Sequence, residues 1–402
     1  MRLRRDGGTL DLLGARIITY AAAGLVILAI ARILGPKDYG FYATGAALAS
    51  LSLVFSYLGQ DQHFLTGRLS IEKLKVRNGQ VAILSVILLA LFCNLWPHVS
   101  VTTRLCGLFI GLGIILNRLL LPYLVVPLAN LDFQTRAKRE LGLLATWPIL
   151  GFFIGLILGA SPIHFGLGGF TAALLLLIPG KTRFKDFRSL FRDRSLRDLR
   201  DGAPYAISGA LYVIYFQSDV AVLGTLSPAK TVGLYAAACT FVSVGILAST
   251  AVSNDIMRTR LYKSHVGYAD FRNTAIQLGK VNAACGILAG TAMIVGAHIL
   301  VSVVYGSAYR NATTLVGVLG VAVIIYYFSN WASNIVIAAG NIRLVVLSQL
   351  GLSIINLAGN FLLIPRFGAA GSAWMTVSCE LAGVAIYGVI LIKRKLLAVI
   401  PS

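Results

Sequence analysis

Charged side chains inside long apolar stretches are the residues of this sequence whose types could do chemistry. Arg118 lies near the middle of one stretch, whereas Arg16 and Arg32 lie toward the two ends of another. Glu380 and Asp219 are embedded acids. Because a charge is costly in an apolar environment, such residues mark binding sites or ion pathways. The arginines therefore predict a site for an anion, and the acids predict ion-coupling groups.

Arg118 has the strongest local signal, because it stands beside Asn117 and shortly before Pro122. Proline has no N–H group, so the carbonyl of Arg118 lacks its usual helical partner and a kink is expected. A buried cation at a kink is typical of an anion site on a helix that bends. An ion pair with a carboxylate on a neighbouring helix is the alternative. Arg16 and Arg32 either bind the same anion or extend to lipid headgroups.

The two embedded acids differ in depth. Glu380 lies near the centre of the last apolar stretch, and Asp219 lies toward the outer end of the seventh. Desolvation disfavours the charged form of an acid in the membrane, which suits a group that couples a cycle to protons. A paired or permanently protonated structural acid is the alternative interpretation.

Polar residues recur at helical spacing in two apolar stretches. One set is Ser208, Tyr212, Tyr215 and Asp219, and the other is Gln349, Ser353, Asn356 and Asn360. The steps in each set are three or four residues, so the members share one helical face. We predict that these faces line a polar interior in which Tyr215, Asn356 and Asn360 bind the ligand. Hydrogen bonds that join helices are the alternative.

Glycines at four-residue spacing predict close helix packing and no ligand contact. They are Gly151, Gly155 and Gly159 in one stretch and Gly286 and Gly290 in another.

Membrane-spanning helices are the elements that must position these residues. Of 402 residues, 57% are hydrophobic and 12% are charged, and the mean hydropathy is +0.81. A soluble protein could not bury so much apolar surface. Runs of about 20 apolar residues, enough to cross a bilayer, recur along the chain. Twelve spans are predicted, at 11–34, 40–60, 80–97, 105–128, 141–160, 165–180, 203–225, 231–254, 281–304, 312–338, 343–363 and 370–392. The predicted fold class is an all-α polytopic membrane protein with about 12 transmembrane helices.

Basic residues predict the orientation of these spans. With the N-terminus inside, twenty-six of the 35 Lys and Arg residues fall in cytoplasmic stretches, such as 129–140, and five fall in outer loops. Positive residues favour the cytoplasmic side, so both termini are expected in the cytoplasm. The net charge of +20 is then mostly a topology signal, and no nucleic-acid partner is expected.

The chain repeats two short patterns in the same order. LGPKDYGFYA at 34–43 is echoed by LSPAKTVGLYA at 226–236, and FGLGG at 165–169 is echoed by FGAAG at 367–371. The two offsets are nearly equal, which predicts a duplication of six spans. Because six is even, both halves enter the membrane in the same direction, forming the parallel repeat typical of transporters.

Three regions follow from this repeat. An N-terminal six-helix lobe is predicted at 1–180, a basic linker at 181–202 and a C-terminal six-helix lobe at 203–402. The linker contains eight basic and four acidic residues, and its apolar residues share one helical face. This pattern predicts an amphipathic helix on the inner leaflet with membrane lipids as its partners. A solvated linker is the alternative.

Neither a metal nor another cofactor is expected. The cysteines and histidines are scattered and form no metal-ligand spacing or acid–base cluster. They are Cys93, Cys106, Cys239, Cys285 and Cys379, with His63, His98, His164, His265 and His298. Since the predicted loops are too short for a catalytic domain, the chain is not expected to be an enzyme.

A series of segments carries a family resemblance: 34–40, 59–68, 233–235, 305–309, 339–340 and 360–373. In this order, over nearly the whole chain, they resemble bacterial polysaccharide flippases of the O-antigen (Wzx-like) type. These belong to the multidrug/oligosaccharidyl-lipid/polysaccharide exporter superfamily. One departure is SNDIM at 253–257, where the family often has a proline.

The resemblance implies two six-helix lobes around a central cavity, and alternating access. The implied cargo is an undecaprenyl-diphosphate-linked oligosaccharide, exported across the bacterial cytoplasmic (inner) membrane for O-antigen, lipopolysaccharide or exopolysaccharide synthesis. A glycan polymerase and chain-length proteins are further implied partners. The residue chemistry agrees, because arginines match diphosphate oxygens and hydroxyls and amides suit a glycan.

Other functions fit parts of the pattern. A drug/cation antiporter of the same superfamily would need carboxylates in the first lobe, where the embedded charges are Arg16, Arg32 and Arg118. A flippase for the peptidoglycan precursor would share the chemistry of the cargo. A membrane-embedded glycan-assembly enzyme and a scaffold protein are the remaining alternatives.

Overall fold

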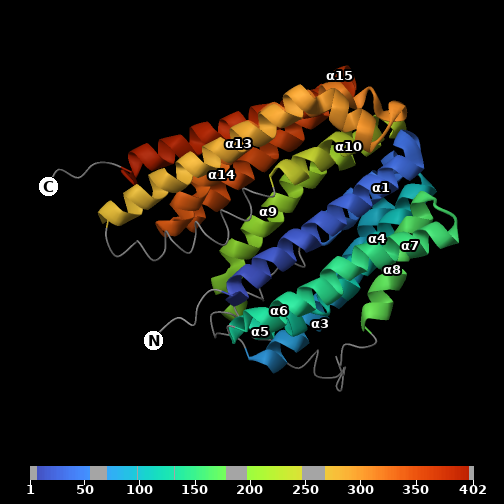
Figure 1. The fold of residues 1–402 in the computed structure, drawn as a ribbon, viewed down its shortest axis with the longest axis horizontal. Coiled ribbons are helices and arrows are strands. Elements are labelled where there is room, and N and C mark those ends of the chain that lie inside the picture. Colours follow the sequence, from blue (N-terminus) through green and yellow to red (C-terminus); the bar gives the residue numbers. More distant parts are fainter. Residues whose placement is uncertain are drawn as a thin grey trace. The chain divides into compact units, whose positions relative to one another are not determined.

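The computed structural model of the chain describes residues 7–54, 70–96, 98–130, 132–177, 197–246 and 268–397. Within these ranges every regular element is a helix (Figure 1). The elements are α1 (Gly7–Ser52), α3 (Ile71–Leu95), α4 (Val101–Arg118), α5 (Leu121–Ala129), α6 (Phe133–Arg139), the π-helix η2 (Glu140–Ala145), α7 (Thr146–Leu158), α8 (Pro162–Leu177), α9 (Arg197–Leu226), α10 (Ala229–Gly245), α13 (Tyr268–Val304), the 3-10 helix η5 (Ser307–Tyr309), α14 (Ala312–Ala338) and α15 (Ile342–Lys393). The predicted all-α class is confirmed.

Two helices are too long to cross a membrane only once. α1 contains 46 residues and α15 contains 52. At about 1.5 Å per residue each would extend well beyond the roughly 30 Å hydrocarbon core. Each is broken at a glycine with positive φ, Gly35 at 70° and Gly368 at 55°, a conformation that other residues rarely adopt. Divided there, with α4–α5 and α6–η2–α7 each taken as one segment, the helices match the twelve predicted spans.

The described residues include eight helices that are long and apolar enough to cross a membrane. The chain is therefore a multi-pass membrane protein. The helical segment that contains the fifth predicted span begins earlier than that span, at Phe133, so α6 lies within the stretch 129–140. Basic residues at a helix end can extend toward the headgroups. Glu140 lies directly before the predicted span 141–160, at the end of α6.

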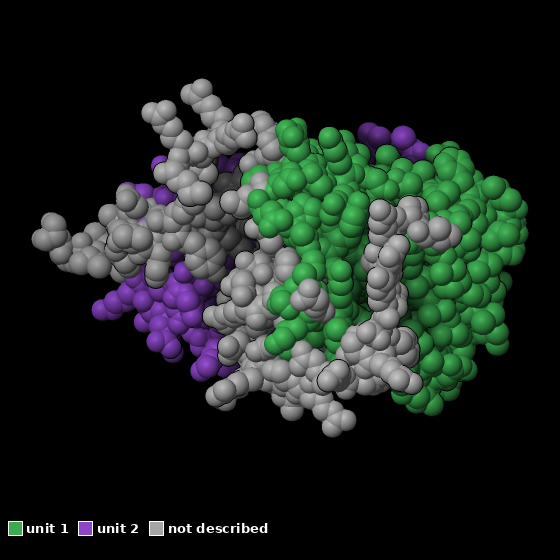
Figure 2. All heavy atoms as spheres, turned by 90° about the horizontal axis from the view of Figure 1, so that it is seen from below, with its two compact units in different colours: residues 1–213 green, residues 214–402 purple. Residues whose placement is uncertain are grey.

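The chain divides into two compact units, Met1–Val213 and Ile214–Ser402, which Figure 2 colours green and purple. The boundary lies within α9. Most of the predicted linker, at 181–196, lies outside the described residues, as do the segments 59–68 and 253–257. The lobe boundaries at 180 and 203 stay predictions.

In unit 1, α8 packs against α4 and α7, and α1 packs against α4 and α6. The contact between α7 and α8 requires glycine. A Cβ atom on Gly168 would overlap the carbonyl oxygen of Gly151 and lie 2.8 Å from the nitrogen of Gly155. The predicted packing role of Gly151 and Gly155 is confirmed. Gly159 differs, because it ends α7 with a φ of 124°.

In unit 2, α14 packs against both α13 and α15. A Cβ on Gly290 would lie 2.5 Å from the carbonyl oxygen of Gly320, and one on Gly286 would lie 2.7 Å from the side chain of Tyr327. The predicted packing role of Gly286 and Gly290 is therefore confirmed. This packing holds α13 against α14, which also contacts α15, a helix with a row of buried polar residues along its length.

Candidate functional site

Asp219 on α9 is buried and accepts three hydrogen bonds within unit 2. Tyr235 on α10 donates to Oδ2 at 2.8 Å, and the hydroxyl of Thr376 donates to the same oxygen at 3.1 Å. The amide of Asn360 donates to Oδ1 at 2.8 Å. Thr376 and Asn360 lie on α15, on opposite sides of the break at Gly368. Both oxygens of a buried carboxylate are thus bound by neutral donors, which stabilise its ionised form.

Two asparagines extend this network along α15. Asn356 and Asn360 are both fully buried. Oδ1 of Asn356 accepts from Ser218 at 3.1 Å, and Oδ1 of Asn360 accepts from Ser372 at 2.8 Å. The Nδ2 atom of Asn356 is buried and has no hydrogen-bond partner among the described residues. Since an unsatisfied buried donor costs about 1–3 kcal/mol, it is a feature that folds retain mainly at functional sites.

Glu380 forms a second buried carboxylate centre on α15, one turn beyond Thr376. Tyr215 on α9 donates to Oε1 at 2.9 Å, and Ser329 on α14 donates to Oε2 at 2.7 Å. Tyr215 and Asp219 are one turn apart on α9, as Thr376 and Glu380 are on α15. The same face of α9 therefore meets the same face of α15 at both centres.

The two centres have different chemical capacities. Asp219 is surrounded by hydroxyl and amide groups from α10 and both parts of α15. Carboxylate, hydroxyl and amide oxygens are the ligands that hard cations prefer. Glu380 has hydroxyl partners from two neighbouring helices. Among the described residues no group of three His, Cys, Asp or Glu side chains could hold a metal ion.

The polar stripes predicted from the sequence meet each other in unit 2. Ser353, Asn356 and Asn360 are all buried, as expected for one inward face of α15. On α9, Asp219 is buried and Tyr215 is half-buried, whereas Tyr212 is 43% exposed. The hydrogen bonds from Ser218 to Asn356 and from Asn360 to Asp219 join the two faces. Their predicted role in binding a ligand stays a prediction.

Arg118 ends α4 in unit 1, at the predicted kink. The next helix, α5, starts at Leu121 with Pro122 in its first turn. The side-chain amide of Asn78 on α3 donates to the carbonyl oxygen of Arg118 at 2.8 Å. Asn78 therefore replaces the N–H group that Pro122 lacks. This contact uses only the backbone of Arg118, whose side chain is half-buried.

Substitution of Asn78 by alanine is expected to lower the stability of unit 1 by about 1–3 kcal/mol, because the buried carbonyl of Arg118 loses its donor. Pro122→Ala restores a backbone N–H four residues after that carbonyl. In the double variant the loss is therefore expected to shrink. Thermal unfolding of the wild type, both single variants and the double variant measures this coupling. If Asn78→Ala lowers the stability equally with and without Pro122→Ala, the two residues are not coupled.

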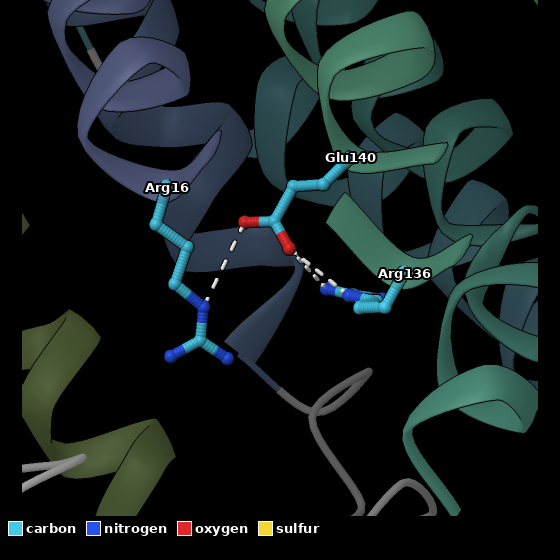
Figure 3. A network of polar contacts seen from close by, with 3 residues as sticks. All are labelled: Arg16, Arg136 and Glu140. Atoms are coloured by element: carbon cyan, nitrogen blue, oxygen red, sulfur yellow. Dashed lines mark hydrogen bonds and ion pairs between the residues drawn. The ribbon is translucent and has the colours of Figure 1, made fainter. Parts of the chain in front are cut away.

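Arg16 on α1 belongs to a network with Arg136 and Glu140, which Figure 3 shows. Nη2 of Arg136 lies 2.9 Å from Oε2 of Glu140, and its Nε donates to the same oxygen at 3.0 Å. Nε of Arg16 lies 3.8 Å from Oε1. Glu140 is thus a buried carboxylate between two arginines. Arg32, on the other hand, lies on an exposed face of α1.

Sequence reasoning missed several members of these centres. Glu140 and Arg136 carry a signal, their four-residue spacing, but they fall in a stretch predicted to be cytoplasmic. Tyr235 lies in the repeated pattern at 226–236. Nothing in that repeat indicates that Tyr235 contacts Asp219. The remaining missed partners are single polar residues without a spacing signal: Asn78, Ser218, Ser329, Ser372 and Thr376.

The fold occurs in solved membrane transporters. No protein-family profile and no curated protein sequence matches the chain. Among solved structures, the lipid II flippase MurJ in an inward closed conformation matches with a TM-score of 0.68 and 14% identity, over 96% of this chain and 87% of MurJ. An inward-facing multidrug resistance MATE family transporter of the MOP superfamily matches with a TM-score of 0.66 and 12% identity, over 95% of this chain and 96% of that one. The fold is that of MATE and MurJ.

A third structure with the MATE/MurJ fold adds a ligand to the comparison. The MATE multidrug transporter DinF-BH, solved as a ligand complex, matches with a TM-score of 0.66 and 11% identity, over 97% of this chain and 95% of DinF-BH. The MATE/MurJ fold thus accommodates both a flippase and multidrug transporters. At these identities the fold is what is shared, and the cargo has to be argued from the residues of this chain.

Proposed function

We propose that the protein is an ion-coupled flippase for an undecaprenyl-diphosphate-linked oligosaccharide. It moves this lipid from the inner to the outer leaflet of the bacterial cytoplasmic membrane by alternating access, for synthesis of a surface polysaccharide such as O-antigen, lipopolysaccharide or exopolysaccharide. Both termini are in the cytoplasm. A glycan polymerase and chain-length proteins are its partners in assembly.

The observation that carries this proposal is the charge of unit 1. Its buried carboxylate, Glu140, is contacted by two arginines, Arg16 and Arg136. Arg118 and Arg32 add further positive charge to the described part of the unit. A cationic drug would be repelled by these arginines, whereas a diphosphate would be attracted. Arg118, with Arg16 or Arg32, is proposed to bind the diphosphate.

The carboxylates of unit 2 support coupling to an ion. Asp219, with its hydroxyl and amide neighbours, is proposed to bind the coupling cation, and Glu380 is proposed to exchange a proton or cation with it. Asn356, Asn360 and Tyr215 lie in or beside these centres. We propose that they bind the polar headgroup in the conformation that opens unit 2 to the cargo.

A multidrug/cation antiporter is the second candidate, because the same fold is shared with MATE transporters. Its specific support is the pair of buried carboxylates in unit 2, which could bind a cationic drug as well as a coupling ion. A test therefore has to separate a lipid-linked anion from a free organic cation.

Deletion of the gene, followed by assays of lipid-linked oligosaccharide and surface glycan, makes this separation. The proposal expects surface glycan to vanish and its lipid-linked unit to accumulate on the cytoplasmic leaflet. Lipid-linked units that reach the outer leaflet unpolymerised would assign the protein to a later step, as an enzyme or scaffold. Normal glycan with raised sensitivity to cationic drugs would favour the antiporter.

A further inference from the structure

We propose that Arg16 and Arg136 form a phosphate site at which Glu140 acts as an internal counter-ion, and that the diphosphate of the cargo displaces this carboxylate when it binds. The inference rests on the proposed function for the identity of the cargo. It adds a site and an exchange step that the position of Arg118 alone does not provide.

The geometry is that of a phosphate site filled by a carboxylate. Two nitrogen atoms of Arg136 contact one oxygen of Glu140, at 2.9 and 3.0 Å, and Arg16 approaches the other oxygen at 3.8 Å (Figure 3). Carboxylate and phosphate oxygens fit the same guanidinium fork. The side chain of Glu140 is 7% exposed and that of Arg136 is 12% exposed, whereas Arg16 is 26% exposed. Arg16 therefore forms both the looser contact and the accessible side of the site.

The charges favour an exchange of ligands. Arg136 and Arg16 both contact the one carboxylate of Glu140. A diphosphate carries more negative charge and more acceptor oxygens than Glu140 does. Loss of the Glu140 contacts is therefore offset by stronger contacts to the phosphate, and the two arginines stay paired throughout.

Thr19 adds an independent observation. It lies one turn from Arg16 on the same face of α1 as Leu12 and Ala15, which pack with Ala137 of α6. Its Oγ1 atom is buried and has no hydrogen-bond partner among the described residues. A buried hydroxyl without a partner is unfavourable, and a phosphate oxygen is an acceptor that would satisfy it.

The backbone at Glu140 provides a way for the carboxylate to leave. The π-helix η2 begins at Glu140 and ends at Ala145, between α6 and α7. Such π turns hold one extra residue and occur frequently at functional sites. A side-chain rotation of Glu140 at this irregular turn would separate the carboxylate from Arg16, while Arg136 keeps its place on α6.

The test measures binding of undecaprenyl diphosphate to the purified chain in lipid nanodiscs, by the shift in unfolding temperature during titration. Glu140→Gln removes the competing charge and is expected to lower the Kd about tenfold. Asp132→Asn is the matched control. This substitution removes one negative charge near the same end of the span, as Glu140→Gln does. Asp132, however, contacts Thr135 at the start of α6.

The control should keep its helix cap, because asparagine caps helices as well as aspartate. Hydrogen bonds from the side chain and backbone of Thr135 hold the pKa of Asp132 below its usual value, so this residue is ionised near neutral pH. Asp132→Asn therefore changes net charge by the same amount as Glu140→Gln. An unchanged Kd is expected for this variant.

Arg136→Gln keeps the test decisive if Glu140→Gln does not fold. Glu140 then pairs with Arg16 alone, and the Kd is expected to rise about tenfold. Unchanged affinity in both Glu140→Gln and Arg136→Gln would overturn the inference and leave a structural ion pair, while binding by the wild type would still support the proposed function. A parallel titration with phosphatidylglycerol identifies the source of the phosphate. The inference expects the tenfold change for undecaprenyl diphosphate, and an equal change for phosphatidylglycerol would overturn the cargo assignment.

Discussion

Asp219→Asn is expected to leave unit 2 folded and to reduce export by about 100-fold, as loss of one strong charge contact of roughly 3 kcal/mol would. Asparagine fits the site because its oxygen can still accept from Asn360. Its new NH2 group can donate to the hydroxyls of Tyr235 and Thr376, which rotate to accept. The variant therefore removes the charge and retains the hydrogen bonds.

The measurement compares surface glycan in cells with the unfolding temperature of the purified protein. Asp219→Ala is the structural contrast, because it removes the acceptor that Tyr235 and Thr376 share and one acceptor of Asn360, and it should lower stability by about 1–3 kcal/mol. Glu380→Gln, whose amide can keep Tyr215 and Ser329 as partners, tests the second carboxylate in the same way. Full export by Asp219→Asn would remove Asp219 from the coupling role. If Glu380→Gln loses export and Asp219→Asn does not, the coupling role belongs to Glu380.

Arg118→Ala is expected to reduce export about 100-fold, because a guanidinium that binds a diphosphate contributes several kcal/mol. Its fold should be retained, since the contact with Asn78 uses the backbone carbonyl and survives any side-chain change. Arg118→Lys keeps the charge and loses the fork, so a smaller loss of about tenfold is expected. Accumulation of the lipid-linked unit on the cytoplasmic leaflet is the direct measurement.

Arg366→Gln is the matched control for this prediction. Arg366 is an exposed arginine on α15, shortly before the break at Gly368, and its loss changes net charge by the same amount. Export close to wild type is expected. If Arg118→Ala and Arg118→Lys both retain full export, the diphosphate does not bind at Arg118, and the residue has a structural role only.

The helical fold and the kink at Arg118 could be predicted because each depends on residues that are close in sequence. An apolar run of about 20 residues is a span in any context. A proline four residues after Arg118 always frees the carbonyl of that residue. The polar faces of α9 and α15 could be predicted for the same reason, since helical spacing alone determines which residues share a face.

The partners across helices could not be predicted in this way. Nothing in the local sequence indicates that Asn78 donates to Arg118, because that contact depends on how α3 packs against the kink. Glu140 could not be predicted as a site residue, because its contact with Arg16 depends on how α1 packs against α6. The pairing of Tyr215 with Glu380 likewise depends on the relative height of two helices.

That relative height has a mechanical consequence. α9 and α15 are joined at two levels, by Tyr215 with Glu380 and by Asp219 with Thr376. If α9 slid along α15 by one turn, about 5.4 Å, Asp219 would come level with Glu380. Two ionised carboxylates repel strongly where water is scarce. Repulsion between the two acids therefore opposes a slide in this direction while both are ionised.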